Sequence, residues 1–396
     1  MMVVTFKTFQ SGIGDCIFLL LKQGEKQFSI MVDCGEYTEE ITNYVQNDLH
    51  KHIDLLVVTH IDSDHILGVE TMLTATPDLS IGRIIFNCYQ RDPSKAPITL
   101  TTQQKKRLLS IQSEINAIFR DMVEQEVSAQ QAIKCLSMSI LKSWKSQWDR
   151  PYVALDAKNE ISIGEWGTIK FLAPTMKQIK ALDKEFKSIL FSELFIEQDG
   201  IEFKNSESIY EILVRYANLY EEEPFEEHET ATNDLEQALI EAAEESVNEN
   251  SITTSNKASL AFVWEKGNNR VLFLGDARPG LVVKGLLRQY PIGPFPMRFD
   301  AIKVSHHGSH FNTTEDLMEH IDSEHFFLTG GEEGMRPSEA ALGRILLRPL
   351  KCDINKRVLH VNYPTSLTDK LKKDIVLQKK YHFVVDYDQN KHEFTL

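Results

Sequence analysis

The feature that most constrains this chain is a dense polar loop that directly follows an apolar run. The largely apolar residues 53–58 lead into Thr59-His60-Ile61-Asp62-Ser63-Asp64-His65, so two histidines and two aspartates fall within six residues. Imidazole and carboxylate groups are the side chains that bind divalent first-row metals. The alternative is a purely structural role, in which the polar loop caps a helix through Asp or Ser. The density of ligand-type residues favours a metal site.

Three other predicted strands also end in polar residues. The strand over 28–32 ends in Asp33, that over 270–274 in Gly275-Asp276, and that over 300–305 in His306-His307. Sites in layered α/β folds are assembled at strand ends. A carboxylate placed between two ions is a natural bridge. We therefore expect Asp276 and one histidine of the pair to complete the site that the loop begins.

The remaining segments differ in character. Residues 101–148 contain no Gly or Pro and carry apolar residues at helical spacing, which predicts an insertion of one or two amphipathic helices. A second, acidic insertion over about 185–255 follows, and its part over 221–255 is predicted to be flexible. The C-terminal stretch Tyr381–Leu396 is predicted to form a hairpin around 388–390. These patterns divide the chain into one large domain over 1–350, which contains both insertions, and an extension over 351–396 that packs on it.

The negative charge is concentrated in one segment. The net charge of the chain is −15, and residues 193–250 hold 18 Asp and Glu against two Lys and Arg, a net of −16. The rest of the chain is then close to neutral, at +1. The acidity therefore does not exclude an anionic substrate elsewhere on the molecule. It also leaves room for a protein partner or a homodimer contact through the helical or the acidic insertion.

The cysteines and the apolar runs indicate a cytoplasmic protein. Five scattered cysteines form no CxxC pair, which is typical of thiols in a reducing compartment. No apolar run approaches the ~20 residues of a membrane span, and the N-terminus lacks the regions of a signal peptide. We expect no membrane association.

The spacing of these residues resembles the metallo-β-lactamase superfamily. The His-x-Asp-x-Asp-His loop follows Asp33-Cys34-Gly35 and precedes Gly275-Asp276. The turn Gly12-Ile13-Gly14-Asp15 and the segment 303–309, Lys-Val-Ser-His-His-Gly-Ser, are most similar to the branch typified by the metallo-hydrolase domain of the competence protein ComEC. The resemblance covers about 1–90, 151–175 and 256–350.

This resemblance implies an αββα sandwich with two divalent metal ions at one edge. Zinc is favoured, and manganese is the alternative because Asp62 makes the site oxygen-rich. Asp64 and His306 match catalytic positions, with His306 as a proton donor or phosphate contact, although the residues alone do not separate His306 from His307. The implied metal ligands are His60, Asp62, Asp64, His65, Asp276 and His307. The implied supporting or substrate-contacting residues are Asp33, Asp15, Ser309 and Arg336.

Two departures from the family pattern stand out. The superfamily's middle histidine, expected between the loop and Asp276, has no good counterpart, since His228 lies in the acidic run. Arg336-Pro337 stands where the branch usually has His-Pro, and an arginine there could bind a phosphate or carboxylate. No implied ligand lies in 221–250, so we expect deletion of that segment to leave metal content unchanged.

These features predict a metal-dependent hydrolase. A phosphodiesterase or nuclease acting on nucleic acid or a nucleotide is favoured, because ComEC-type domains are associated with such hydrolysis. One alternative is an ester, thioester or lactam hydrolase of the same fold. The other is a catalytically weak regulatory or partner-binding subunit, for example of a defence system. The absence of the middle histidine favours this alternative.

Overall fold

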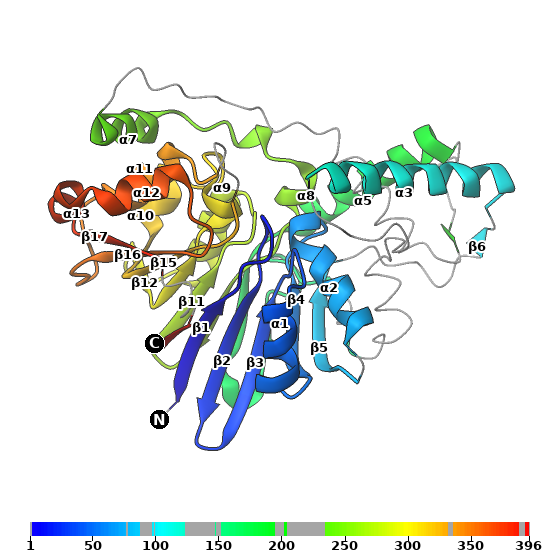
Figure 1. Cartoon of the computed structure of the whole chain (residues 1–396), viewed down its shortest axis with the longest axis horizontal. Coiled ribbons are helices and arrows are strands. Elements are labelled where there is room, and N and C mark those ends of the chain that lie inside the picture. The colour runs from blue at the N-terminus through cyan, green and yellow to red at the C-terminus, as the bar shows by residue number, and fades with distance from the viewer. Residues whose placement is uncertain are drawn as a thin grey trace.

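Two β-sheets form the centre of the molecule (Figure 1). The computed structural model describes residues 2–76, 78–87, 97–98, 100–122, 147, 152–194, 202–203, 234–331, 336–387 and 393–395. The first sheet has the order β18-β1-β2-β3-β4-β5 and the second β17-β16-β15-β13-β11-β10-β8-β7. The first comprises β1 (Val3–Thr8), β2 (Ile17–Gln23), β3 (Lys26–Val32), β4 (His52–Val58), β5 (Ser80–Phe86) and β18 (Glu393–Thr395). The second comprises β7 (Glu160–Ser162), β8 (Thr168–Ala173), β10 (Ala261–Lys266), β11 (Asn269–Phe273), β13 (Ala301–Lys303), β15 (His325–Leu328), β16 (Arg357–Val361) and β17 (Phe383–Asp386).

Helices cover the outer face of each sheet. Those on the first sheet are α1 (Glu39–Asn43), the π-helical turn η1 (Tyr44–Asp48) and α2 (Ser63–Ala75). Those on the second are α7 (Leu235–Glu244), α9 (Pro279–Gln289), α10 (Glu315–His320), α11 (Glu339–Leu346), α12 (Ser366–Lys373) and α13 (Ile375–Tyr381). The helices α3 (Thr102–Met122) and α5 (Met176–Leu194) extend beyond the end of the sandwich near α8 (Thr254–Lys257) (Figure 1). Two short strand pairs complete the described elements: β6 (Pro97–Ile98) with β9 (Glu202–Phe203), and β12 (Met297–Phe299) with β14 (Ile321–Ser323).

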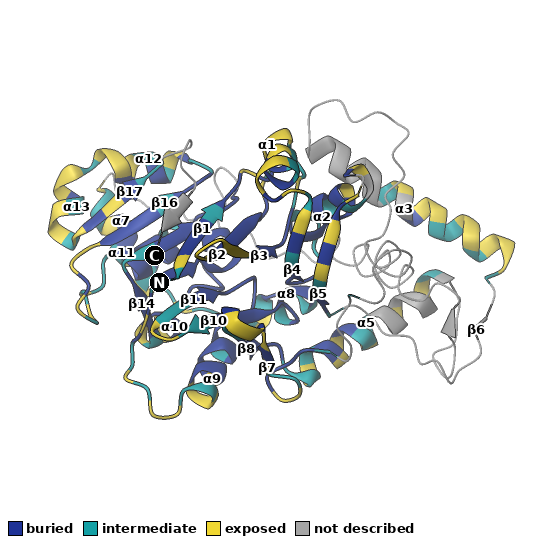
Figure 2. Cartoon of the chain, turned by 90° about the horizontal axis from the view of Figure 1, so that it is seen from below, coloured by how far each residue is buried: buried dark blue, intermediate teal, exposed yellow. Residues whose placement is uncertain are grey.

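Successive side chains of each strand alternate between the core that lies between the two sheets and the helices on the outer face. In β2, Ile17, Leu19 and Leu21 point to the core between the sheets, while Phe18 and Leu20 point to the helices of the first sheet. A strand buried on both faces reads as a continuous apolar run, as this one does. The second sheet has a matching outer core against its helices, and the strands of both sheets are largely buried (Figure 2). The predicted αββα sandwich is confirmed.

The four strands that end in polar residues bring those residues to one edge. β3 pairs with β4 in parallel, and β11 pairs with β13 in parallel, so the carboxyl ends of each pair lie together. Asp33 and the 60–65 loop leave the first sheet, while Asp276 and the histidine pair leave the second. The site therefore lies where the two sheets meet at this edge.

The predicted C-terminal hairpin is wrong. β17 pairs in parallel with β16 in the second sheet, whereas β18 pairs antiparallel with β1 in the first. The two strands carry the right local pattern but find partners in different sheets, so residues of the 351–396 extension belong to both. Tyr381 itself ends α13. Local sequence sets strand propensity, and tertiary context sets pairing.

The predicted flexibility of 221–255 is wrong for its second half. Residues 235–244 form α7, whose Leu239 is fully buried, and short helices follow at Glu249–Ser251 and in α8. Backbone contact is so close that a Cβ added to Gly343 of α11 would lie 2.4 Å from the Leu239 carbonyl oxygen. Deletion of 221–250 would therefore remove a packed helix, which the sequence-based expectation for that deletion did not consider. His228, Cys88, Cys135 and most of the helical and acidic insertions lie outside the described residues.

Candidate metal centre

The 60–65 loop begins α2 rather than merely preceding it. Asp62 occupies the N-cap position, but its side chain makes no cap hydrogen bond, and Asp64 and His65 lie in the first turn. The carboxylate of Asp62 instead accepts a hydrogen bond from Ser255 Oγ at 2.5 Å. The helix start thus presents its ligand-type side chains to the site and leaves the capping role to backbone groups.

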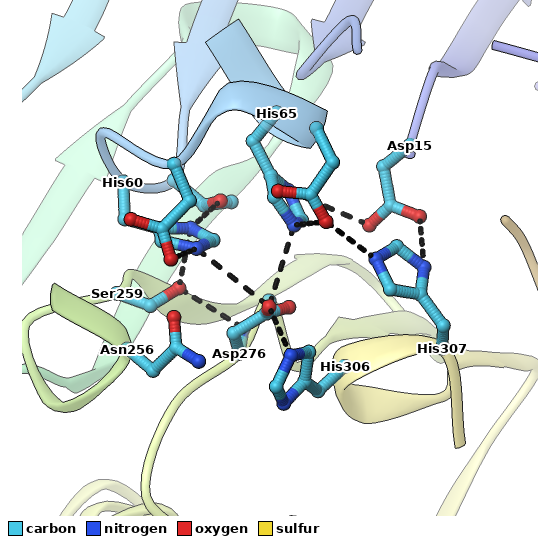
Figure 3. Close-up of polar contacts among 12 residues, drawn as sticks. Asp15, His60, His65, Asn256, Ser259, Asp276, His306 and His307 are labelled. Carbon is cyan, nitrogen blue, oxygen red and sulfur yellow. Dashed lines mark hydrogen bonds and ion pairs between the residues drawn. The ribbon is translucent and has the colours of Figure 1, made fainter. Parts of the chain in front are cut away.

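The side chains from the two sheets converge into two adjoining clusters (Figure 3). In one, His60 Nε2 lies 3.6 Å and His65 Nε2 lies 3.3 Å from Asp276 Oδ2. In the other, Asp64 Oδ2 lies 3.6 Å from His65 Nε2 and 3.1 Å from His307 Nε2. Ligand-type atoms within each cluster all lie within 4.8 Å of one another. Each cluster could hold a metal ion, and because both contain His65, its one Nε2 lone pair can bind only one of the two ions.

Each of three histidines has a hydrogen-bond acceptor beside its Nδ1. His65 Nδ1 lies 2.9 Å from the Asp33 carboxylate, and His307 Nδ1 lies 2.7 Å from the Thr329 carbonyl oxygen. His60 Nδ1 lies 2.9 Å from Thr59 Oγ1, whose own proton goes to Asp33. A neutral imidazole that donates from Nδ1 carries its lone pair on Nε2. All three Nε2 atoms therefore direct lone pairs at carboxylates, an arrangement that requires a cation or added protons between them.

The buried polar atoms at the centre fit a metal ion. His60 Nε2, His65 Nε2 and Asp276 Oδ1 are buried and hydrogen-bond to none of the described residues. A buried polar group without a partner costs about 1–3 kcal/mol. Imidazole nitrogen and carboxylate oxygen are ligands for zinc and manganese. The donor set present here therefore fits the divalent ions that the sequence predicts.

The electrostatics of the cluster point the same way. Burial alone would lower the pKa of His65, but Asp276 and Asp64 outweigh it and raise that pKa well above its usual value. Burial likewise opposes charge on His307, yet Asp15 and Asp64 raise its pKa to about 9. For Asp276, burial favours the neutral acid, but His306, His65 and His60 hold the pKa well below its usual range. The pocket thus stabilises positive charge between its carboxylates.

Asp33 forms hydrogen bonds to two residues of the loop. Its carboxylate accepts hydrogen bonds from the Thr59 backbone N–H, the Thr59 hydroxyl and His65 Nδ1. These contacts fix the orientation of two histidine rings at once. Carboxylates in this position commonly orient metal-bound histidines.

Asp15 lies in a buried charge network that the sequence analysis did not anticipate. Its carboxylate lies 2.6 Å from Lys303 Nζ, accepts a 2.5 Å hydrogen bond from Thr329 Oγ1, and lies 3.4 Å from His307 Nδ1. Lys303 is 1% exposed. The turn that carries Asp15 packs directly under the loop, since a Cβ on Gly14 would lie 1.8 Å from the Asp64 carbonyl oxygen. Gly14 is required there by close backbone approach.

Two serines near α8 are further residues that sequence reasoning missed. Ser259 Oγ lies 3.3 Å from His60 Nδ1 and accepts a hydrogen bond from the Asp276 backbone N–H. Ser255 donates to Asp62, and Asn256 lies beside Asp276 (Figure 3). No ligand-type signal marks these serines in the sequence, because they act by position alone.

Two predicted supporting residues have other surroundings. The Ser309 side chain accepts a hydrogen bond from the Phe311 backbone N–H and so stabilises the loop after the histidine pair. Arg336 is half-buried, and its carbonyl oxygen lies near Gly331, where an added Cβ would be 2.8 Å away. Contact of Ser309 or Arg336 with a substrate stays a prediction.

Comparison with known families agrees with this architecture. Residues 13–119 match the family model described as the metallo-beta-lactamase superfamily. The match spans β2 to β5, the polar loop and most of α3, so this part of the chain is similar to the metallo-beta-lactamase superfamily. No curated protein matches the chain. None of the described helices is both long and apolar enough to cross a membrane.

Proposed function

We propose that this chain is a binuclear, metal-dependent phosphodiesterase that acts on nucleic acid or on a nucleotide. The observation that carries the proposal is the convergence of three histidine Nε2 atoms on Asp64 and Asp276, with every Nδ1 hydrogen-bonded to an acceptor. We assign His60, Asp62, Asp64, His65, Asp276 and His307 as ligands. The preference for a phosphodiester rests on the ComEC-type motifs and on the aspartate-rich donor set.

The chain's own residues suit attack on a phosphoryl group. Two bound divalent ions would polarise phosphoryl oxygens and promote the ionisation of water at neutral pH. The side chains of Asp62 and Asp64 are each 21% exposed, whereas those of His60, His65 and Asp276 are at most 2% exposed. Substrate therefore approaches from the side of the two aspartates, where Asp64 can orient a water molecule.

A small hollow beside His60 does not distinguish between the candidate substrates. Its volume is about 10 Å³. This volume holds about one water molecule and would take neither an acyl chain nor a nucleotide. Its lining consists of Thr59, His60, Ile61, Asn87, Ile179, Leu182 and Ala258. Ester, thioester or lactam hydrolysis thus remains the second candidate, without a described pocket at this position to favour it.

A substrate panel tests the proposed function. The purified protein, supplied with Mn²⁺ or Zn²⁺, is assayed on bis(p-nitrophenyl) phosphate, single-stranded DNA and a p-nitrophenyl ester. We expect metal-dependent phosphodiester turnover that falls at least about 1,000-fold in Asp64→Ala. The matched control is Asp316→Ala, an exposed aspartate of α10, which should retain activity.

Three outcomes separate the candidates. Phosphodiester turnover that depends on Asp64 supports the proposal. Turnover of the ester alone overturns it in favour of acyl hydrolysis. A protein that binds two metal ions but hydrolyses none of the panel overturns it in favour of the regulatory alternative.

A further inference from the structure

The adjacent histidines 306 and 307 diverge into different parts of the site. Both have positive φ angles, 47° and 53°, which are uncommon for residues other than glycine. Their ring centroids lie 6.0 Å apart with an interplanar angle of 59°. His307 Nε2 reaches Asp64, whereas His306 Nε2 reaches Asp276 Oδ2 at 3.4 Å (Figure 3). Strained backbone of this kind persists where the surrounding structure demands a particular placement of side chains.

The amide of Asn312 fixes the tautomer of His306. Asn312 Nδ2 donates to the backbone carbonyl oxygens of Asp276 and Ala277, at 2.9 and 3.3 Å. Its Oδ1 must then face His306 Nδ1, which lies 3.0 Å away, so Nδ1 is the donor in that hydrogen bond. The neutral His306 ring therefore directs its Nε2 lone pair at the Asp276 carboxylate. This is the same arrangement that His60, His65 and His307 show.

The position of His306 does not suit a proton donor for a leaving group. Its side chain is only 5% exposed and lies beside Asp276, whereas the open side of the site is formed by Asp62 and Asp64. A general acid must lie within hydrogen-bond reach of the departing oxygen. Because Nδ1 of His306 is hydrogen-bonded to Asn312, only Nε2 can bind a further group, and Nε2 faces the Asp276 carboxylate.

We propose that His306 is a metal ligand at the His60–Asp62–Asp276 end of the centre, with Asn312 as its positioning residue. The histidine pair then supplies one ligand to each end, His306 beside Asp276 and His307 beside Asp64. This assignment replaces the proton-donor role that the sequence favours for His306. It also provides the imidazole for which the sequence offers no candidate between the loop and Asp276. The inference rests on the proposed binuclear centre and specifies one of its ends.

Metal titration tests this inference without depending on turnover. Metal-free protein is titrated with Mn²⁺ by calorimetry, and the number of ions and each Kd are measured. For wild type we expect two ions. His306→Ala should retain one ion near its wild-type Kd, while the Kd of the other rises at least about 100-fold. Asn312→Ala should raise the same Kd about 10–100-fold. His320→Ala, a histidine of α10 outside the site, is the control and should match wild type.

The outcomes distinguish a ligand from an acid and from a failed function. If His306→Ala binds two ions with wild-type Kd values, the inference is overturned. Loss of turnover on a dinucleotide, with turnover of bis(p-nitrophenyl) phosphate retained, would instead assign His306 as the acid, because p-nitrophenolate needs no protonation. Circular dichroism of the metal-free variants reports folding, and Asn312→Ala carries the test if His306→Ala does not fold. If the wild-type protein binds two ions but cleaves no phosphodiester, the proposed substrate class is refuted. The titration of His306→Ala then still tests whether His306 is a ligand.

Discussion

Asp33 illustrates how one buried carboxylate organises several groups of the candidate centre. It is fully buried and has a positive φ of 56° at the end of β3. Its two oxygens accept three hydrogen bonds, from Thr59 N–H, Thr59 Oγ1 and His65 Nδ1. Thr59 in turn accepts from His60. A single side chain therefore sets the orientation of both histidine rings of the loop.

Substitution of Asp33 by Asn should weaken metal binding without removing a ligand. An amide retains one acceptor oxygen but cannot accept all three hydrogen bonds, so the ring of His65 loses its fixed tautomer. We expect the Kd for Mn²⁺ to rise about 10–100-fold, measured by competition with a chelator. Asp54→Asn is the matched control, because Asp54 also accepts from a backbone N–H and a hydroxyl, those of Ser29. Equal effects of the two substitutions would refute a specific role for Asp33.

At the scale of elements, β15 and β16 place two histidines against each other. His325 Nδ1 lies 3.0 Å from His360 Nε2, and the His360 ring stacks on Phe327 at 4.5 Å between centroids. Burial, and then the neighbouring His360, lowers the pKa of His325 to about 4. Burial also lowers the pKa of His360, although Asp386 opposes that shift. Both rings are thus held neutral in the folded sheet.

This pair should make the protein less stable in mild acid. Between about pH 6.5 and pH 4 the unfolded chain binds a proton at His325 that the folded chain does not, so stability falls as pH decreases through that range. We expect a contribution of about 1–3 kcal/mol. Urea denaturation at pH 7, 5.5 and 4.5 should show a smaller loss for His325→Gln than for wild type. The exposed His50→Gln serves as the control, and an unchanged pH dependence in His325→Gln would refute the assignment.

Arg344 of α11 joins α7 to the loop that follows the histidine pair. Its guanidinium donates to the carbonyl oxygens of Ala243 and Glu245 at the end of α7, and to those of His310 and Thr313. These four acceptors come from segments that are far apart in the sequence. The described end of the acidic segment is therefore anchored to the core through backbone groups as well as through the ion pairs Glu236–Lys380 and Glu249–Arg278.

Arg344→Ala should destabilise the fold substantially. The substitution leaves several buried carbonyl groups without donors, so we expect a loss of about 2–4 kcal/mol in the free energy of unfolding. Urea denaturation measures this loss. Arg288→Ala, an exposed arginine of α9, should change stability by less than about 0.5 kcal/mol. A similar small effect at Arg344 would show that the anchor contributes little.

At the scale of the whole molecule, the centre connects the two sheets. His60, Asp64 and His65 follow β4 of the first sheet, whereas Asp276 and His307 follow β11 and β13 of the second. The carboxylates and imidazoles of these two halves meet at distances of 3.1–3.6 Å. Bound metal would therefore cross-link the sandwich at this edge.

Divalent metal should accordingly stabilise the whole fold. Ligand that binds only the folded state at 100 times its Kd adds about 2.7 kcal/mol. We expect Tm to rise on addition of Mn²⁺ or Zn²⁺ to metal-free protein and to fall again with a chelator, as measured by calorimetry. Asp276→Ala, which removes the carboxylate nearest to three histidines, should lose most of this rise. A Tm that is insensitive to both ions would contradict the metal centre.

The sequence by itself predicted most of the strands of the two sheets and the ligand-type residues of the candidate centre. Alternating and continuous apolar runs predict the strands, and the residues directly after them predict the ligand-type side chains, because both depend on a few neighbouring positions. The strand pair β10–β11 was accessible in this way, whereas the αββα sandwich and the contact of Asp33 with the loop were expected from the resemblance to the metallo-β-lactamase superfamily.

Only the tertiary structure decided which strands pair, which residues contact the ligand-type side chains and where the two adjacent histidine rings point. β17 and β18 enter different sheets, α7 packs on α11, and Ser259 reaches His60 across 199 positions of sequence. No local pattern specifies these contacts, because each depends on which surfaces the folded layers bring together. The same holds for the adjacent residues His306 and His307, which the sequence alone does not distinguish. Their backbone angles and the hydrogen bond from His306 to Asn312 direct one ring to each end of the site.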